Sequence, residues 1–138
     1  MKLRLVSHSP DIETTIATSM KPTTSGAMPS TLFNRFKDRP EKVEDIVGRI
    51  ELQHGNILEH NRLVWSLEAP RDMVLDVMLR TKYLNFTKLG NDRWVVSGNL
   101  RSVIELHITH RDDFTETLVE TIMEASPRIY DFIRRSEK

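Results

Sequence analysis

The sequence predicts one α+β domain, in which a small antiparallel sheet packs against several helices. Three segments, 2–7, 61–68 and 83–97, have the alternating or β-rich pattern of strands. The segments between and after them carry apolar residues at helical spacing. Neither an internal repeat nor a linker divides the 138 residues. We therefore expect residues 1–138 to form a single domain, since this length is sufficient for one hydrophobic core.

The first strand and helix are predicted from short apolar patterns near the N-terminus. Residues 2–7 alternate in polarity, with Leu3 and Leu5 on the apolar face of a half-buried strand. Apolar residues then recur at helical spacing, at Ile12, Ile16 and Met20. This helix should end before Pro22, because proline disfavours helical geometry in the residue before it. Segment 22–30 is rich in turn formers, so we expect it to be a loop.

A regular helix is predicted next, followed by a second strand. Asp38, with Glu41 three residues later, has the pattern of a capping box. The helix that follows carries an apolar stripe: Val43, Ile46, Val47 and Ile50. Segment 61–68 then alternates in polarity and should present one apolar face, formed by Leu63, Trp65 and Leu67.

The rest of the chain is predicted as a helix, a hairpin and three further helices. Pro70 suits a first helical turn, and this helix should end near Lys82. Segment 83–97 contains two β-like runs around the turn residues 90–92, which is the pattern of a hairpin. Caps for the last three helices are available in order along the chain: Ser97 or Asn99, Asp112 or Asp113, and Ser126.

Composition and charge exclude several classes of protein. The chain has no cysteine, so it can form no disulfide framework, iron–sulfur cluster or thiolate zinc site. Its 20 basic and 20 acidic residues leave no formal net charge, which argues against a nucleic-acid partner. No apolar run reaches the length of a signal peptide or a spanning helix. We therefore expect a cytoplasmic protein without a membrane partner.

Cations and aromatic residues alternate near the hairpin, which is typical of a nucleotide-binding surface. Arg80 and Lys82 could neutralise a phosphate, while Tyr83, Phe86 and Trp94 offer flat apolar surface to a base or a flavin ring. One alternative is that the rings pack inward and the cations form a solvated face. Another is that the same surface binds single-stranded nucleic acid.

The start of the following helix favours the nucleotide-binding interpretation. Gly98 and Asn99 precede a helix whose first backbone N–H groups and positive dipole end favour an anion. Arg101 lies in the first helical turn, where the helix dipole alone favours an acidic residue. Arg101 is therefore a candidate ligand-binding residue.

Histidines offer a second kind of candidate site. His54 and His60 lie on either side of Glu59, and His107 and His110 lie about one turn apart on a predicted helix. If the two pairs faced each other, they could bind zinc. A single histidine is usually satisfied by a hydrogen bond instead, so we expect no metal.

The order of these motifs resembles that of the flavin-dependent thymidylate synthases. The similarity runs from His54 to Pro70, through Arg80-x-Lys82, and from Trp94 to Leu106, where Asn-x-Arg-Ser begins a helix. Residues 1–20 are also similar to the first strand and helix of that family. The resemblance implies the thymidylate synthase-like version of the predicted α+β fold.

The resemblance also implies a function and a set of ligands. Family members use FAD and NADPH to convert dUMP to dTMP with methylenetetrahydrofolate, and they are homotetramers with flavin sites between subunits. The chain would accordingly bind a flavin or nucleotide, and it would be a methyltransferase if it is active. The implied cofactor-binding residues are His54, Asn56, Arg80, Lys82, Asn99, Arg101 and Glu105, and the implied catalytic residues are His110 and Arg111.

Several positions depart from the family pattern. The family's Arg-His-Arg signature corresponds here to Arg80-Thr81-Lys82, and lysine lacks the planar fork of arginine. The signature serine is absent, and the arginine that holds uracil corresponds to His110, with Arg111 beside it. A long helical segment of the family is replaced by the turn at 90–92. We therefore expect ligand binding to survive more readily than catalysis, with a non-catalytic oligomeric scaffold as the alternative.

Overall fold

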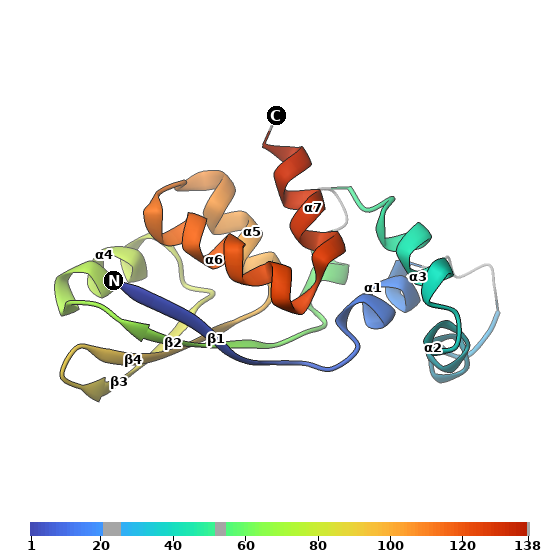
Figure 1. Ribbon diagram of the computed structural model, residues 1–138, viewed down its shortest axis with the longest axis horizontal. Helices are drawn as coiled ribbons and strands as arrows, with labels where there is room; N and C mark the ends of the chain where they lie inside the picture. Colours follow the sequence, from blue (N-terminus) through green and yellow to red (C-terminus); the bar gives the residue numbers. More distant parts are fainter. Residues whose placement is uncertain (21–25, 52–54, 138) are drawn as a thin grey trace.

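The chain forms a four-stranded sheet with helices packed on it (Figure 1). The computed structural model describes residues 1–20, 26–51 and 55–137. The strands are β1 (Lys2–His8), β2 (Leu63–Glu68), β3 (Asn85–Gly90) and β4 (Arg93–Gly98). The α-helices of the described residues are α1 (Ile12–Met20), α2 (Pro29–Lys37), α3 (Pro40–Val47), α4 (Arg71–Arg80), α5 (Leu100–Thr109), α6 (Asp113–Ala125) and α7 (Pro127–Ser136), with a 3-10 helix, η2 (Gly55–Glu59).

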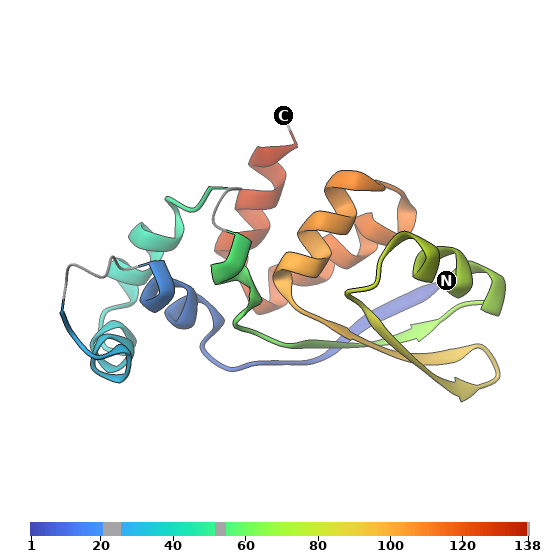
Figure 2. The ribbon, with the colours of Figure 1, turned by 180° about the vertical axis from the view of Figure 1, so that it is seen from behind.

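The sheet is antiparallel throughout and has the strand order β1-β2-β4-β3, which confirms the predicted α+β class. Helices α5 and α6 lie over one face of the sheet, and α7 follows beside α6 (Figure 1). Helices α1, α2 and α3 contact one another beyond the end of β1, as both views show (Figures 1 and 2). The described helices leave the opposite face of the sheet uncovered (Figure 2).

The core lies between the sheet and these helices. On β2 the alternating residues Leu63, Trp65 and Leu67 are buried, as the sequence predicts, because a strand presents every second side chain to the same face. The indole Nε1–H of Trp65 donates a hydrogen bond to Thr121 Oγ1 of α6 at 2.8 Å. This bond satisfies a buried polar group and fixes α6 over the centre of the sheet.

The hairpin of β3 and β4 has a tight turn. Gly90 pairs with Arg93 across β3 and β4, so Asn91 and Asp92 form a two-residue loop. Their φ angles are 49° and 60°, in the left-handed region that a type I′ turn requires at both central residues. The predicted hairpin is therefore confirmed, and the twist of this turn suits the two strands that it joins.

Three predictions near the N-terminus need correction. The predicted loop 22–30 ends early, because α2, which was not predicted, begins at Pro29. Residues 21–25 of the chain lie outside the described residues. Asp38 does not cap α3, because it ends α2 and its N–H bonds to the carbonyl of Phe36. Arg39 is the N-cap residue of α3 and supplies no side-chain cap. The helix itself ends at Val47, short of the predicted Ile50, which is nevertheless buried.

The caps of the last three helices follow the prediction. Asn99 caps α5, Asp112 caps α6 with Thr115 in a reciprocal capping box, and Ser126 caps α7. Each side-chain oxygen accepts a backbone N–H that the helix cannot satisfy itself. These local signals fix the positions at which α5, α6 and α7 begin, and α5 carries most of the candidate site.

Candidate functional site

Two adjoining cavities along α5, the larger of which faces the end of α4, are lined by most of the predicted cofactor-binding residues. The larger, of about 590 Å³, is lined by the end of α4, by the segment 81–83 and by one flank of α5. The smaller, of about 130 Å³, lies over the start of α5. Tyr83 and Glu105 line both cavities, which we together call the α4–α5 groove. The groove also brings together Arg80, Lys82, Asn99 and Arg101.

Asn99 has a structural role at the start of α5. Its Oδ1 accepts the backbone N–H of Ser102 at 2.8 Å and the hydroxyl of Ser102 at 3.0 Å. The N–H of Leu100 donates instead to Asn61 Oδ1, at 2.8 Å. Two of the N–H groups that the sequence suggested for an anion are therefore already occupied. The predicted anion site at this helix start is corrected to a capped helix end.

Arg101 is held by two carboxylates. Its Nε lies 2.9 Å from Glu105 Oε1 on the same helix, and its Nη1 lies 2.8 Å from Glu59 Oε1 of η2. The hydrogen bond to Glu105, and then that to Glu59, raise the pKa of Arg101 above its ordinary value. These partners explain the cation in the first turn of α5. They also give the cluster one positive and two negative charges, which disfavours a phosphate at Arg101.

Gly55 allows this cluster to form close to the backbone. A Cβ atom at Gly55 would lie 3.2 Å from the guanidinium carbon of Arg101, closer than ordinary contact. Asn56, the next residue of η2, is exposed and lines neither cavity of the groove. His54 lies outside the described residues.

Arg80 lines the groove, but its charge is directed to two aspartates. It pairs with Asp76 at 3.3 Å within α4 and forms a short hydrogen bond with Asp112, the N-cap of α6. Partial burial acts to raise the pKa of Asp112, but the N–H of Thr115 and the Arg80 guanidinium lower it below its ordinary value. Arg80 therefore joins the end of α4 to the start of α6 and is not free to bind phosphate.

Lys82 is the cation of the groove that remains available for an anion. Within the described residues it forms no ion pair, and its Nζ lies 5.7 Å from the centre of the Tyr83 ring. The Tyr83 side chain is 56% exposed, so its ring presents apolar surface beside this charge. A phosphate near Lys82 and a flat ring on Tyr83 would fit this pair of residues.

The other aromatic residues of the hairpin turn toward the core. Trp94 is buried, and its Nε1–H donates to the carbonyl of Ala69 at 3.0 Å. Phe86 is half-buried and packs against the core cluster. The predicted row of three ligand-facing rings is thus reduced to Tyr83, because the strand pattern directs Phe86 and Trp94 to the covered face of the sheet. This geometry removes the main support for single-stranded nucleic acid as the ligand.

The two predicted catalytic residues lie outside the groove. His110 is the C-cap residue of α5, is exposed, and has its Nδ1 3.0 Å from Thr109 Oγ1. Arg111 pairs with Glu116 at 3.0 Å and lies 3.6 Å from Glu137, and it lines a separate cavity on another flank of α5. The groove residues and the implied catalytic pair therefore do not form one active site within this chain.

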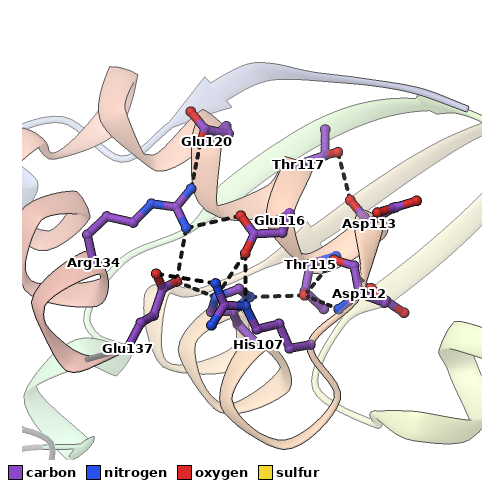
Figure 3. A network of polar contacts seen from close by, with 10 residues as sticks. His107, Asp112, Asp113, Thr115, Glu116, Thr117, Glu120, Arg134 and Glu137 are labelled. Atoms are coloured by element: carbon purple, nitrogen blue, oxygen red, sulfur yellow. Dashed lines mark hydrogen bonds and ion pairs between the residues drawn. The ribbon is translucent and has the colours of Figure 1, made fainter.

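A polar network around the buried His107 joins α5, α6 and α7 (Figure 3). The His107 side chain is 2% exposed, and its Nε2 lies 2.6 Å from Glu137 Oε1. Because a carboxylate only accepts hydrogen bonds, Nε2 carries the proton of this bond. Arg134 of α7 bridges Glu116 at 3.0 Å and Glu137 at 2.9 Å. The sequence singled out His107 but not these partners.

The acidic members of this network are stabilised as carboxylates. Burial acts to raise the pKa of Glu116, but Arg134 and then Arg111 lower it below its ordinary value. Burial acts in the same way on Glu137, where His107 and Arg134 lower the pKa. Both groups are therefore charged at neutral pH, and together with the two arginines they hold the end of α7 against α5 and α6.

The network contains a hydroxyl, an imidazole and a carboxylate in the order of a catalytic triad. His107 Nδ1 lies 3.0 Å from Thr115 Oγ1, and Nε2 bonds to Glu137. Thr115 is fully buried, and its hydroxyl is also bonded to the backbone of Asp112. A nucleophile must reach its substrate, so this arrangement is structural and not a hydrolase site.

The network is also the group of described residues that comes nearest to a metal site. Ligand atoms of His107, Glu116 and Glu137 lie within 4.8 Å of one another. The carboxylates already accept hydrogen bonds from Arg111 and Arg134, and a cation would have to displace these guanidinium groups. The zinc site considered from sequence shares only His107 with this group. His60 and His110 are exposed and are not among these ligands, and His54 lies outside the described residues.

No family model, curated protein or solved structure matches this chain. Among the described residues, no helix combines the length and apolar character needed to cross a membrane.

Proposed function

We propose that the protein is a compact relative of the flavin-dependent thymidylate synthases that binds a flavin or a nucleotide in the α4–α5 groove. The observation that carries this proposal is the convergence of Arg80, Lys82, Asn99, Arg101 and Glu105 on the groove. The sequence resemblance implied these residues as cofactor ligands. Residues that are up to 25 positions apart meet on one surface because the β3–β4 hairpin returns the chain to α5.

The tight hairpin is compatible with this relationship. A type I′ turn joins β3 to β4 and keeps both strands in the sheet, so loss of the long family segment need not disturb the core. The order β2, α4, β3, β4, α5 is the order of the motifs that carry the resemblance. The thymidylate synthase-like fold is therefore part of the proposal.

The groove fits one phosphate and one ring system better than it fits several phosphates. Lys82 would bind the phosphate, and Tyr83 would contact the ring beside it. Arg80 and Arg101 would shape the walls through their ion pairs. A cavity of about 590 Å³ lies within the range of small-ligand sites. A bound flavin would supply hydride transfer.

The proposal is limited to ligand binding. His110 and Arg111, the residues implied for catalysis, lie outside the groove, so among the described residues the implied ligands and the implied catalytic pair do not form one site for converting dUMP to dTMP. Methyl transfer with methylenetetrahydrofolate and NADPH would require groups from another subunit. A homotetramer, which the resemblance implies, is one way to supply them.

The test is a titration of the purified protein with FAD, FMN and dUMP, in which the melting temperature and the flavin absorbance are measured at each ligand concentration. We expect at least one ligand to raise the melting temperature in a saturable manner. Lys82→Gln should weaken that binding at least tenfold, because it removes the available cation of the groove. Lys42→Gln, on an exposed position of α3, should bind as the parent protein does. Absence of any shift or bound flavin would refute the proposal.

The second candidate function is an oligomeric scaffold, which exposed apolar residues on α4 favour. The Leu79 side chain is 88% exposed, and Leu75 and Met78 are also exposed on the same helix. Large apolar side chains clustered on a surface are typical of an interface. In this reading α4 contacts a second copy of the chain, and the groove is covered rather than filled by a ligand.

Sedimentation velocity and the ligand titration together separate the two candidates. Leu79→Glu should lower the sedimentation coefficient if α4 forms a subunit interface, whereas Leu89→Glu, at an exposed position of β3, should not. A scaffold is supported if the parent protein assembles and neither FAD, FMN nor dUMP binds. An unchanged monomer in both variants would exclude the scaffold.

A further inference from the structure

A separate cavity of about 200 Å³ lies between α5 and α7 and shares no lining residue with the larger cavity of the α4–α5 groove. Its walls are mainly apolar and are formed by Ile104, Ile108, Phe132 and Ile133. An engineered apolar cavity of about 150 Å³ is known to bind benzene. The volume therefore suits a ligand with a branched aliphatic or monocyclic body.

One end of this cavity carries a cation and an anion side by side. Arg111 and Glu137 both line it, and Arg111 Nη2 lies 3.6 Å from Glu137 Oε2. This separation exceeds a normal hydrogen bond, so the two groups are near each other without a tight direct contact. The Arg111 side chain is 54% exposed and that of Glu137 is 17% exposed, which places the pair at the solvent side of the cavity.

Both charged groups are also bonded to members of the His107 network, in which Figure 3 labels Glu137. The Nε of Arg111 donates to Glu116 Oε1 at 3.0 Å. The Oε1 of Glu137 accepts from His107 at 2.6 Å and from Arg134 at 2.9 Å. The anchoring bonds use Arg111 Nε and Glu137 Oε1, so among the described residues the Nη groups of the arginine and Oε2 of the glutamate form no hydrogen bond, and both residues line the cavity. A site whose groups are held by other bonds needs little reorganisation on binding.

We infer that this cavity binds a free apolar α-amino acid of the size of leucine or phenylalanine. The α-carboxylate would accept hydrogen bonds from the Nη groups of Arg111, and the α-ammonium would donate to Glu137 Oε2. The side chain would fill the apolar space between Ile104, Ile108, Phe132 and Ile133. This site is independent of the flavin or nucleotide site proposed above.

The paired charges select a zwitterion over a simple ion. A monocarboxylate that reached Arg111 would also lie near the Glu137 carboxylate, and a simple amine at Glu137 would lie near the Arg111 guanidinium. Each case places like charges a few ångströms apart. A zwitterion satisfies both groups and adds no net charge. Glycine has the zwitterion but no side chain to exclude water from the apolar walls.

The test compares L-leucine and L-phenylalanine with three analogues, by calorimetry and by amide shifts in NMR spectra. The analogues are 4-methylpentanoate, which lacks the ammonium, 3-methylbutylamine, which lacks the carboxylate, and glycine, which lacks the side chain. We expect one of the two amino acids to bind saturably with a stoichiometry of one. Each analogue should bind at least tenfold more weakly, because each removes one of the three recognised features.

Three exposed positions provide the variants, so that loss of binding is separable from loss of folding. Arg111→Gln should weaken amino-acid binding at least tenfold, and Ile108→Asn should weaken it through the apolar wall. Arg49→Gln removes an exposed arginine outside the cavity and should bind as the parent does. The inference is overturned if neither amino acid binds, if an analogue binds as tightly as leucine and phenylalanine, or if folded Arg111→Gln binds them unchanged. The flavin titration is read separately, so failure of one proposal does not imply failure of the other.

Discussion

The indole Nε1–H of Trp65 on β2 donates a hydrogen bond of 2.8 Å to the hydroxyl of Thr121 on α6. The same hydroxyl donates to the carbonyl of Leu118 at 2.6 Å, so it satisfies two buried groups at once. Trp65 is fully buried beneath α6. Thr121 therefore acts as the polar link between the centre of the sheet and the helix that covers it.

Thr121→Val should destabilise the protein by about 1–3 kcal/mol, because it leaves the buried indole N–H without a partner while nearly preserving side-chain volume. The measurement is the free energy of unfolding from urea titrations. Thr117→Val is the matched control: Thr117 is only half-buried on the same helix, and its hydroxyl bonds locally, to the carbonyl of Asp113. A loss no larger in Thr121→Val than in Thr117→Val would contradict the proposed link.

The pairing of Arg80 with Asp112 should be measurable as a coupling energy. Arg80→Met keeps most of the aliphatic stem, and Asp112→Asn keeps an oxygen that can accept the Thr115 N–H. A double-mutant cycle of these two changes should give about 1 kcal/mol, since residues in direct contact are not additive. The readout is the free energy of unfolding of the four proteins. Additive single effects would mean that the Arg80–Asp112 pair does not stabilise the folded protein, which leaves Asp76 as the partner of Arg80.

Local patterns explain why much of the fold could be predicted. The alternation of Leu63, Trp65 and Leu67 depends only on strand geometry, and the caps Asn99, Asp112 and Ser126 act within a few residues. The hairpin was visible in its turn residues for the same reason. By contrast α2 was missed, because it is a short helix whose buried residue, Phe36, depends on packing against neighbouring helices.

The candidate site depends on contacts between distant parts of the chain, which sequence spacing does not reveal. Arg101 could be identified as an unusual cation, but its partner Glu59 lies 42 residues away. His107 was a candidate ligand, while Glu137, 30 residues later, became its partner only through the docking of α7. Helix spacing also did not show that Glu105 of α5 lines the α4–α5 groove whereas Arg111, just beyond the end of α5, lines a separate cavity, which divides the predicted site.

Asn99 offers a way to separate helix capping from ligand binding. Asn99→Ala should destabilise the protein by about 1 kcal/mol, because the Ser102 N–H and hydroxyl lose their acceptor. Asn99→Asp should retain the stability, since a carboxylate is also an effective cap at a helix N-terminus. If the groove binds a phosphate, the added negative charge should still weaken FAD, FMN or dUMP binding. Equal melting temperatures for Asn99→Ala and the parent protein would show that the cap is unimportant.

The His107 network should make stability depend on acid pH. Because its partners lower the pKa values of Glu116 and Glu137 below the ordinary 4.5, the folded state binds protons less readily than the unfolded state. This contribution is fully present above the ordinary value and is lost as the pH falls through the lowered folded-state values. Urea unfolding between pH 7 and pH 3 should therefore show stability falling at the acid end.

Two glutamine substitutions identify the source of this pH dependence. Glu137→Gln removes one of the two titrating groups, so it should lower stability at pH 7 and flatten the acid loss. Glu124→Gln, at an exposed position of α6, should leave both the stability at pH 7 and the profile close to those of the parent protein. Because Glu137 is bonded to both His107 and Arg134, the loss of unfolding free energy in Glu137→Gln should exceed that in Glu124→Gln at every pH above 5. A parallel acid loss in Glu137→Gln and the parent protein would place the pH dependence elsewhere in the molecule.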